Sequence, residues 1–342
     1  MSWEARLLPD PGQFPGKNLF GLPSSGAKHL RLAHCPRDGR IWINGGDYIG
    51  TTADMDSGRQ EMWSYGIANN SWRLEQPYCL PAGQVQPMHP DETGFCWDDR
   101  RGWFWLVPGY QGPYGGECVG KATALRNRLM SYDPGTGLWT DRGPSPGEVL
   151  RLGDTPKFFH HDPVTDSLIG FGPGPSVLTY EIESARWSMI RLSIGGNPLE
   201  ELSTVDWTAR RLYGLDATLA RIYEWDLDGQ RLVRTFPVDT MAPLANRIGI
   251  TPFVWAPSAQ ALLAFEHHGT RRQLHIWQEG RWRAESVPVI DGLKIKGNCG
   301  VWDPALNMFL LTGGLNPTRL CLYRFDGSIT VPVIQGIQVS VS

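Results

Sequence analysis

The chain has 342 residues, 41% of them hydrophobic, and its 32 basic and 35 acidic side chains leave a formal charge of −3. The length and the apolar content are sufficient for a large buried core, and the near-neutral charge argues against general electrostatic binding to nucleic acid or to an acidic membrane surface. The first residues lack the basic and then apolar pattern of a secretion signal, and no apolar run approaches the length of a membrane span. We therefore expect no membrane insertion and a location in the cytoplasm, or in a virion assembled there.

Segment 1–10 has the pattern of an outer strand whose partner strands lie elsewhere in the chain. Ser2–Pro9 (SWEARLLP) resembles two later segments with the pattern of outer strands, Ser71–Leu74 and Arg281–Pro288. We expect it to join the last sheet of the chain, because an N-terminal strand in that place would remove an open sheet edge. The alternative is that Ile329–Val333 supplies this strand and that one terminus is a tail.

A hairpin pattern of two apolar runs around a tight turn recurs along the chain. The clearest copy, Trp302–Gly314 (WDPALNMFLLTGG), has Asp-Pro at the turn and a glycine pair after the second run. Pro fixes φ, Asp bonds back to the turn, and glycine permits positive φ where the second strand ends. Copies of the pattern start near residues 35, 97, 161, 206, 255 and 302. Self-similarity on this scale indicates a repeat architecture.

A second hairpin follows the first in each copy. It consists of an apolar run that ends in an aromatic residue, a polar turn, and a tryptophan seven residues after the aromatic. The pairs with this spacing are Tyr65 and Trp72, Tyr132 and Trp139, and Tyr180 and Trp187. The three later copies are degenerate, with Trp225 and Leu232, Trp277 and Trp282, and Tyr323 and Phe325 in these places. Each repeat therefore supplies four short strands.

A glycine pair, then an aromatic residue, then a tryptophan resembles the kelch repeat, and Gly45-Gly46, Tyr65 and Trp72 match it best. Three of the six copies lack the glycine pair, so the chain resembles a divergent kelch protein. The resemblance implies an all-β, six-bladed β-propeller of four-stranded antiparallel blades. It spans residues 1–342 as a single domain, with the ring closed by the N-terminal strand. It specifies the fold far better than the function.

The first two repeats are longer than the others because they contain insertions at 47–61 and 109–128. Both insertions lie between the second and third strands, and in a propeller these loops emerge on the same face as the connections between blades. Insertions on one face often mark the binding face, which we call the loop-bearing face. Its aromatic and cationic side chains favour contact with other protein subunits. The residues that we expect to bind there are Tyr48, Arg59, Tyr110, Tyr114, Arg126 and Arg128. The alternative is that the insertions simply cover the end of the ring.

Two histidine pairs, His160-His161 and His267-His268, are the strongest candidates for an active site. His160 and His268, if they converged over the central channel, would suit a carbohydrate-binding protein or a lyase-type carbohydrate-active enzyme. His161, however, takes the place of Trp97 and Trp302 in the repeat, which favours a packing role. No motif indicates catalytic residues, a cofactor or a metal site.

The leading hypothesis is a propeller without enzymatic activity that serves as a protein-binding or assembly module. Only six of the 32 basic residues are lysine, a bias associated with bacterial and phage genomes rich in GC. A phage virion or tail is therefore one setting for such a subunit. The six cysteines show no CxxC or zinc-site spacing, and we expect reduced, mostly buried thiols.

Overall fold

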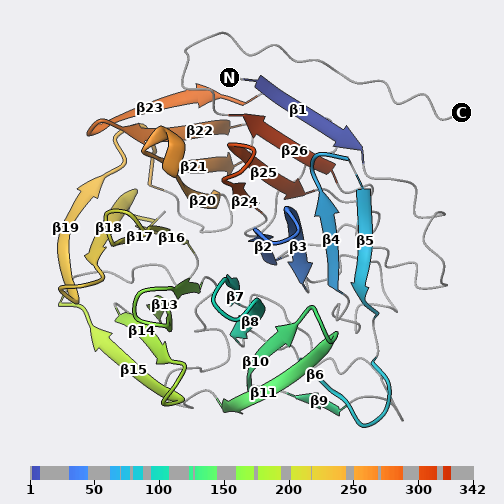
Figure 1. Cartoon of the computed structure of the whole chain (residues 1–342). Helices are drawn as coiled ribbons and strands as arrows, with labels where there is room; N and C mark the ends of the chain where they lie inside the picture. The colour runs from blue at the N-terminus through green and yellow to red at the C-terminus, as the bar shows by residue number, and fades with distance from the viewer. Residues whose placement is uncertain are drawn as a thin grey trace, which may run out of the picture.

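The hairpins expected from the sequence assemble into a β-propeller whose blades are four-stranded antiparallel sheets (Figure 1). The computed structural model describes residues 2–7, 31–44, 62–69, 71–77, 80–87, 94–107, 123–125, 128–144, 159–172, 176–193, 202–216, 218–243, 250–268, 271–287, 300–313 and 319–324. Within these ranges there are six four-stranded sheets, numbered here in chain order, and one two-stranded sheet.

The first three four-stranded sheets contain consecutive hairpins of short strands. Sheet 1 contains β2 (Arg31–Cys35), β3 (Arg40–Asn44), β4 (Met62–Gly66) and β5 (Ser71–Gln76). Sheet 2 contains β7 (Gly94–Asp98), β8 (Trp103–Val107), β10 (Arg128–Asp133) and β11 (Leu138–Pro144). Sheet 3 contains β12 (His160–Asp162), β13 (Ser167–Gly172), β14 (Ser176–Glu181) and β15 (Arg186–Arg191).

The other three sheets repeat this arrangement, with one difference in the last. Sheet 4 contains β16 (Ser203–Asp206), β17 (Arg211–Asp216), β18 (Arg221–Asp226) and β19 (Arg231–Pro237). Sheet 5 contains β20 (Ile250–Ala256), β21 (Ala261–His268), β22 (Arg271–Gln278) and β23 (Arg281–Ser286), with a 3-10 turn at Pro257–Ala259. Sheet 6 contains β24 (Gly300–Asp303), β25 (Met308–Gly313) and β26 (Arg319–Arg324), and its fourth strand is the N-terminal β1 (Ser2–Leu7).

Strand β1 pairs antiparallel with β26, in a register that runs from Ser2 opposite Arg324 to Leu7 opposite Arg319. The first and last described strands of the chain therefore share one sheet, as Figure 1 shows. This is the partner that the sequence predicted for segment 1–10. The competing segment Ile329–Val333 lies outside the described residues.

The turn between the first two strands of each sheet has four residues, and the last of the four always has positive φ. These residues are Gly39, Gly102, Asp166, Arg210, Gln260 and Asn307, with φ between 50° and 74°. A residue with positive φ reverses the direction of the chain while it keeps the two strands in register, and glycine adopts this left-handed conformation without strain. At Gly102 a side chain would also collide with a neighbour, because an added Cβ would lie 1.8 Å from the guanidinium of Arg37 in sheet 1.

The second hairpin brings the expected aromatic pairs opposite one another. Tyr132 lies opposite Trp139, with ring centroids 5.1 Å apart, and Tyr180 lies opposite Trp187, at 4.9 Å. Directly opposed aromatic pairs stabilise antiparallel strands. The spacing of seven residues between the two aromatic side chains therefore indicates a tight turn between two cross-strand partners.

Six hydrophobic clusters form the core among the described residues, and each joins two neighbouring sheets. One unites Trp42 of sheet 1 with Phe104 of sheet 2, whose ring centroids are 4.7 Å apart. Another unites Ile41 and Tyr65 of sheet 1 with Leu310 of sheet 6. The others join sheets 2 and 3, 3 and 4, 4 and 5, and 5 and 6. Burial of apolar area between sheets is therefore the main force that holds the sheets around a common centre.

The two-stranded sheet was not expected from the sequence. Strand β6 (Val85–Pro87), which precedes sheet 2, pairs in parallel with β9 (Thr123–Leu125), which belongs to the second insertion. This pairing attaches the end of the insertion to the connection between sheets 1 and 2.

Among the described residues, no helix has both the length and the apolar character that a membrane-spanning helix needs.

Candidate functional site

One of the six residues expected to bind on the loop-bearing face lies within the described ranges. Tyr48, Arg59, Tyr110, Tyr114 and Arg126 lie outside them. Arg128 begins β10, and its Nε and Nη2 donate hydrogen bonds to the carboxylate of Asp141 at 2.9 and 2.6 Å. The guanidinium holds the pKa of Asp141 below its usual range. Arg128 therefore fixes the end of the second insertion to β11.

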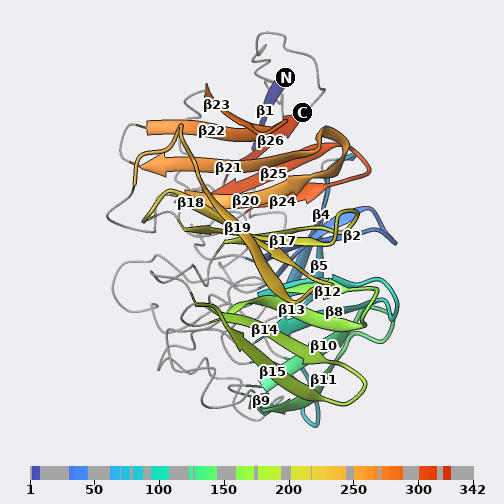
Figure 2. The same cartoon turned by 90° about the vertical axis from the view of Figure 1, so that its left-hand side faces the viewer.

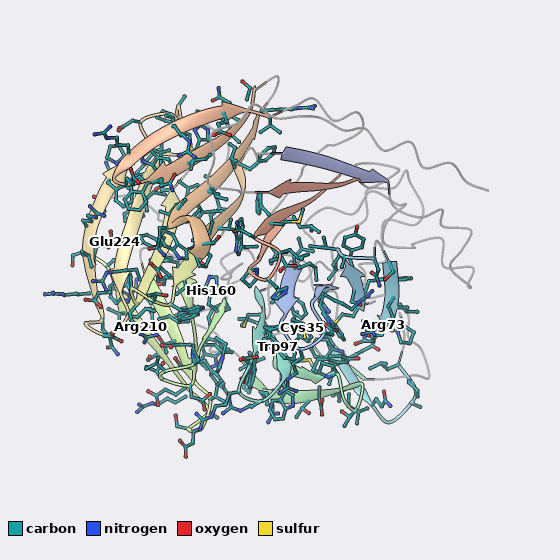
Figure 3. The ribbon with its side chains drawn as sticks, turned by 45° about the horizontal axis from the view of Figure 1, so that its top comes forward. Cys35, Arg73, Trp97, His160, Arg210 and Glu224 are labelled. Atoms are coloured by element: carbon teal, nitrogen blue, oxygen red, sulfur yellow. The ribbon has the colours of Figure 1, made fainter. Side chains whose placement is uncertain are left out.

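The two histidines of the alternative enzyme site belong to different sheets. His160 is in β12, near the centre in Figure 3, and its Nε2 lies 3.1 Å from Ser203 Oγ of sheet 4. Burial lowers the pKa of His160 to about 4, so its imidazole is neutral at pH 7. His268 ends β21 of sheet 5, and its side chain lies outside what the structure describes. Convergence of the two histidines stays an untested prediction.

The turns between the first and second strands lie together at one end of the sheets, and we call this end the turn face (Figure 2). Its turns are residues 36–39, 99–102, 163–166, 207–210, 257–260 and 304–307. In four sheets the first strand ends in a buried aspartate directly before the turn. These aspartates are Asp98, Asp162, Asp206 and Asp303. In each, Oδ1 accepts a backbone N–H of the turn, at 2.9 to 3.1 Å.

Three of the four aspartates pair with a cationic or potentially cationic side chain. Arg210 of sheet 4 donates from Nη1 and Nη2 to the two oxygens of Asp162, at 2.6 and 2.8 Å. His34 Nε2 of sheet 1 lies 3.5 Å from Asp303 Oδ1 of sheet 6. Both pairs bridge neighbouring sheets, and both aspartates are almost completely buried. A buried carboxylate requires such a partner because it has lost its hydration.

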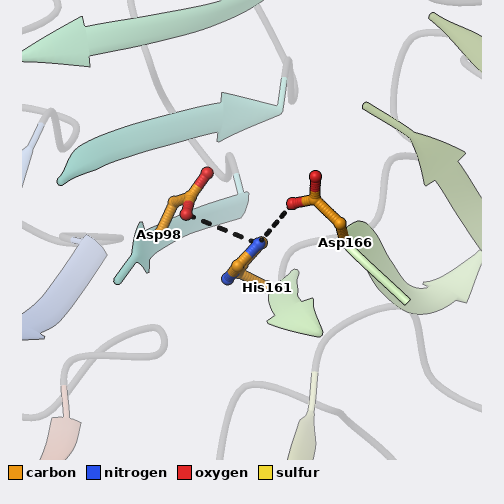
Figure 4. Close-up of side chains that lie close together, drawn as sticks. All are labelled: Asp98, His161 and Asp166. Atoms are coloured by element: carbon orange, nitrogen blue, oxygen red, sulfur yellow. Dashed lines mark hydrogen bonds and ion pairs between the residues drawn. The ribbon is translucent and has the colours of Figure 1, made fainter. Parts of the chain in front are cut away.

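Asp98 has the most extensive set of partners (Figure 4). His161 Nε2 of sheet 3 lies 3.5 Å from Asp98 and 3.2 Å from Asp166. Arg101 donates to Asp98 at 2.9 Å and to both oxygens of Asp166 at 2.6 and 2.5 Å, and Arg100 contacts Asp166 at 3.1 Å. The hydrogen bonds from Arg101 lower the pKa of Asp166 to about 2.

Two carboxylates and one imidazole could in principle hold a divalent ion, since their ligand atoms lie within 4.8 Å of one another. Both carboxylates already bind Arg101, however, and a metal ion would have to displace that guanidinium. The group is best understood as an ion-pair cluster that joins the turns of sheets 2 and 3. The repeat pattern places His161 at a packing position but carries no signal for its contacts with Asp98 and Asp166, or for the binding of Arg101 to both carboxylates.

Asp206 is the exception among the four aspartates. Its Oδ1 accepts the N–H groups of Thr208 and Ala209, but none of the described cations pairs with it, and its Oδ2 has no partner among the described residues. A cleft of about 470 Å³ opens at this carboxylate, between sheets 4 and 5. The cleft is lined by Asp206, Tyr213, Trp255, Ser258, Ala259, Gln260, Trp277, Gln278, Glu279 and Gly280. Tyr213 stacks on Trp255, with ring centroids 5.9 Å apart and an interplanar angle of 25°.

A buried chain of polar groups lies between sheets 4 and 5. His275 Nδ1 is 2.9 Å from Thr240 Oγ1, and His275 Nε2 is 2.9 Å from Glu266 Oε2. A hydroxyl, an imidazole and a carboxylate in series is an arrangement that hydrolases use. Here the imidazole of His275 and the carboxylate of Glu266 are both completely buried. These hydrogen bonds therefore serve to attach the segment after β19 to the interior of sheet 5.

No protein-family model matches the chain, and no curated protein matches its sequence. Solved structures match its fold. One is a gluconolactonase from Xanthomonas campestris, with a TM-score of 0.55 and 9% identity over 87% of this chain and 86% of that one. Another is a chain of the mitotic checkpoint complex, with a TM-score of 0.50 and 10% identity over 89% of this chain and 92% of that one. At these identities the likeness shows the β-propeller fold alone, and the kelch type of repeat stays a prediction.

Proposed function

We propose that the chain is a protein-binding module without enzymatic activity, built on a closed six-bladed propeller of divergent kelch type. The proposal of a closed ring is supported by the hydrophobic clusters, which join every pair of successive sheets and also sheets 6 and 1. It is also supported by the pairing of β1 with β26, which would complete the last blade. A closed ring leaves only short, protected sheet edges and gives a rigid platform for contact loops.

The observation that carries the proposed function is the attachment of the second insertion to the rigid part of the fold. Strand β9 pairs with β6, and Arg128 binds Asp141 bidentately, three residues after β9 ends. A loop whose base is fixed in this way loses less conformational entropy when it binds a partner. The remaining candidates on the loop-bearing face, Tyr110 and Tyr114 among them, would then contact another protein subunit. A phage virion or tail is one assembly that would use such a module.

The mass of the native particle that contains this protein tests the proposal. Light scattering on untagged material from the source should give a complex of defined stoichiometry. The double substitution of Tyr110 and Tyr114 to alanine should release the protein from it, while Leu138→Ala, on an exposed part of β11, should not. A stable particle of 38.2 kDa would correspond to the monomer and would overturn the proposed function.

A further inference from the structure

We propose that the cleft between sheets 4 and 5 binds an arginine side chain of a partner protein. This inference rests on the proposed function, because it assumes that the chain binds proteins, but it concerns the turn face and not the loop-bearing face.

Sheets 2 and 4 have the same turn length, so their residues can be compared one by one. In the strand register Asp98 lies opposite Trp103 across the first turn of sheet 2, and Asp206 lies opposite Arg211 across the first turn of sheet 4. No ion pair joins the side chains of Asp206 and Arg211, because the guanidinium of Arg211 binds Glu224 and Asp226. The third residue of the turn is Arg101 in sheet 2 and Ala209 in sheet 4. The side chain that supplies a guanidinium to Asp98 is therefore missing beside Asp206.

The other routes by which this ring supplies a cation to the aspartate are also unused at Asp206. Asp162 receives Arg210 from the fourth turn position of the following sheet, and that position in sheet 5 is Gln260. Asp98 and Asp303 receive His161 and His34 from the end of the following first strand, where sheet 5 has Trp255. Asp206 is thus a buried carboxylate of the same kind as its three counterparts, with 4% of its surface exposed, but it lines a cleft and none of the described cations pairs with it. One described cation, Arg234, lies near the cleft's aromatic wall, with its Cζ 6.0 Å from the ring centroid of Trp277.

The remaining walls of the cleft suit a planar cation. None of the ten described residues that line it is basic, and Glu279, on the exposed turn after β22, adds a second carboxylate. Tyr213, Trp255 and Trp277 supply aromatic rings, and guanidinium groups stack on such rings more readily than ammonium groups do. Arg142 already shows this mode in the chain, with its Cζ 4.7 Å from the ring centroid of Trp103.

The hydroxyl of Tyr213, a second polar group from the cleft lining, has no hydrogen-bond partner in the part of the chain that the structure describes. Tyr213 takes the register position that Trp105 holds in sheet 2, where the indole Nε1 donates to Asp98 at 3.0 Å. The residue is only 4% exposed, and among the described residues its hydroxyl makes no hydrogen bond. A guanidinium has five N–H donors in one plane and can reach Asp206 Oδ2 and the Tyr213 oxygen together, which a single ammonium does less well.

A polypeptide is the source of the guanidinium that these observations favour. At Asp98 and Asp162 an arginine side chain of the protein itself supplies the guanidinium. The cleft at Asp206 has a volume of about 470 Å³, which is within the range of binding sites for small groups, roughly 300 to 1,000 Å³, and can therefore accept one side chain. An arginine from a partner segment lying over the turns of sheets 4 and 5 would reproduce at Asp206 what the chain does for itself at its other boundaries.

The direct test uses capped single residues as probes. Acetyl-arginine methylamide, acetyl-lysine methylamide, the uncharged acetyl-citrulline methylamide and methylguanidine are titrated against the full chain carrying 15N-labelled indoles. We expect the arginine probe to shift the Trp255 or Trp277 indole signal, and the citrulline probe to bind at least about tenfold more weakly. Equal binding of the citrulline probe or of a neutral oligosaccharide would overturn the proposal. Methylguanidine binding as tightly as the arginine probe would assign the cleft to free guanidinium compounds and overturn the protein source.

Two variants are used, so that the test still gives an answer if one of them fails to fold. Ala209→Arg places the chain's own guanidinium where sheet 2 has Arg101 and should abolish binding of the arginine probe. Asp206→Asn keeps the turn-capping oxygen and removes the charge, and should weaken binding at least about tenfold. Val164→Arg is the matched control, because Val164 is 70% exposed on the turn of sheet 3 and the substitution adds the same charge. Unchanged binding in Ala209→Arg would overturn the proposal.

The outcome is separable from that of the proposed function. If the Ala209→Arg variant no longer binds the arginine probe but still forms the native complex, the partner binds elsewhere. The inference about the cleft would then fail and the proposed function would stand. Arginine binding by a chain that is a monomer in its source would contradict both the protein source of the arginine and the proposed function.

Discussion

Arg210 of sheet 4 and Asp162 of sheet 3 form a bidentate ion pair across a sheet boundary, with donor–acceptor distances of 2.6 and 2.8 Å. Arg210 also occupies the left-handed position of its turn, with φ at 55°. One residue therefore both shapes the turn and neutralises a carboxylate that is almost completely buried. The same two tasks are divided in sheet 2, where Gly102 shapes the turn and Arg101 carries the charge.

We expect Arg210→Asn to destabilise the protein by about 3 kcal/mol, because it leaves Asp162 buried without its counter-charge. Asparagine tolerates the left-handed conformation and stands at the equivalent position 307, so the turn itself is retained. The free energy of unfolding in urea measures the effect. Arg186→Ala is the control, because its pair with Glu181 is exposed to solvent, where water and salt screen the attraction, and should contribute little to stability. Equal effects of the two substitutions would contradict the role given to Arg210.

Gly102 and Gly39 offer a matched test of packing on the turn face. Both have positive φ, but an alanine Cβ would meet the guanidinium of Arg37 at Gly102 and would meet nothing within 4 Å at Gly39. We expect Gly39→Ala to cost about 1 kcal/mol from backbone conformation alone, and Gly102→Ala to cost more. Thermal unfolding measures both. Adding Arg37→Ala to Gly102→Ala should remove the excess, and an excess that persists would show that Arg37 is not its cause.

The four-stranded repeat could be predicted from the sequence because its signals are local. The spacing from Tyr132 to Trp139 encodes a turn between two cross-strand partners, and Asp-Pro encodes the start of another. The cleft could not be predicted in this way, since the aspartates receive their cations from different repeat positions, such as Arg101 and Arg210. An alignment of the turns does show alanine at 209 in place of Arg101, but only the structure shows that no other cation among the described residues pairs with Asp206. The β6–β9 pairing had no signal because parallel strands joined by a long connection carry no turn motif.

His160 should make stability depend on pH in a defined window. Its pKa is lowered by burial to about 4, against 6.5 for an unperturbed histidine. At a pH well above 6.5 neither the folded nor the unfolded state binds the proton, so this residue contributes no pH dependence there. Between pH 6.5 and 4 the unfolded state binds it first, so stability falls as the pH falls.

The variant His160→Gln isolates this effect. It should lose less stability than the parent chain between pH 6.5 and 4, by up to about 3 kcal/mol. The measurement is the free energy of unfolding in urea across this range for both proteins. Parallel pH profiles of the two proteins would mean that His160 is not buried in the neutral form.

Cys35 and Cys96 are free, buried thiols, as expected for reduced cysteines in a large core. Burial raises the pKa of Cys35 to about 11 and also raises the pKa of Cys96, so little reactive thiolate is present at pH 8. We expect iodoacetamide to label both cysteines slowly in the native protein and rapidly in urea. Mass spectrometry of the peptides that contain each residue gives the two rates. Rapid native labelling of Cys35 would contradict its placement at the end of β2.

The pairing of β1 with β26 can be tested by an alternation that only a strand would produce. β1 is an outer strand, so successive N–H groups point alternately toward β26 and away from it. Proline removes one N–H, and it is tolerated on an edge strand only where that N–H faces solvent. Glu4 and Ala5 lie opposite Leu322 and Cys321, so only one of the two N–H groups faces β26. Of the substitutions Glu4→Pro and Ala5→Pro, one should therefore cost clearly more stability than the other, by about 1 kcal/mol or more from the lost hydrogen bond alone.

The costly proline variant should also expose the edge of β26, so we expect it to aggregate at concentrations at which the tolerated variant stays dispersed. Light scattering during thermal unfolding measures both properties. Equal, small effects of the two prolines would show that segment 1–10 does not pair, and the proposed closure of the ring would then fail, because β26 would be left as an open edge. A strong difference would support closure by a strand that lies more than three hundred residues from its partner in the sequence.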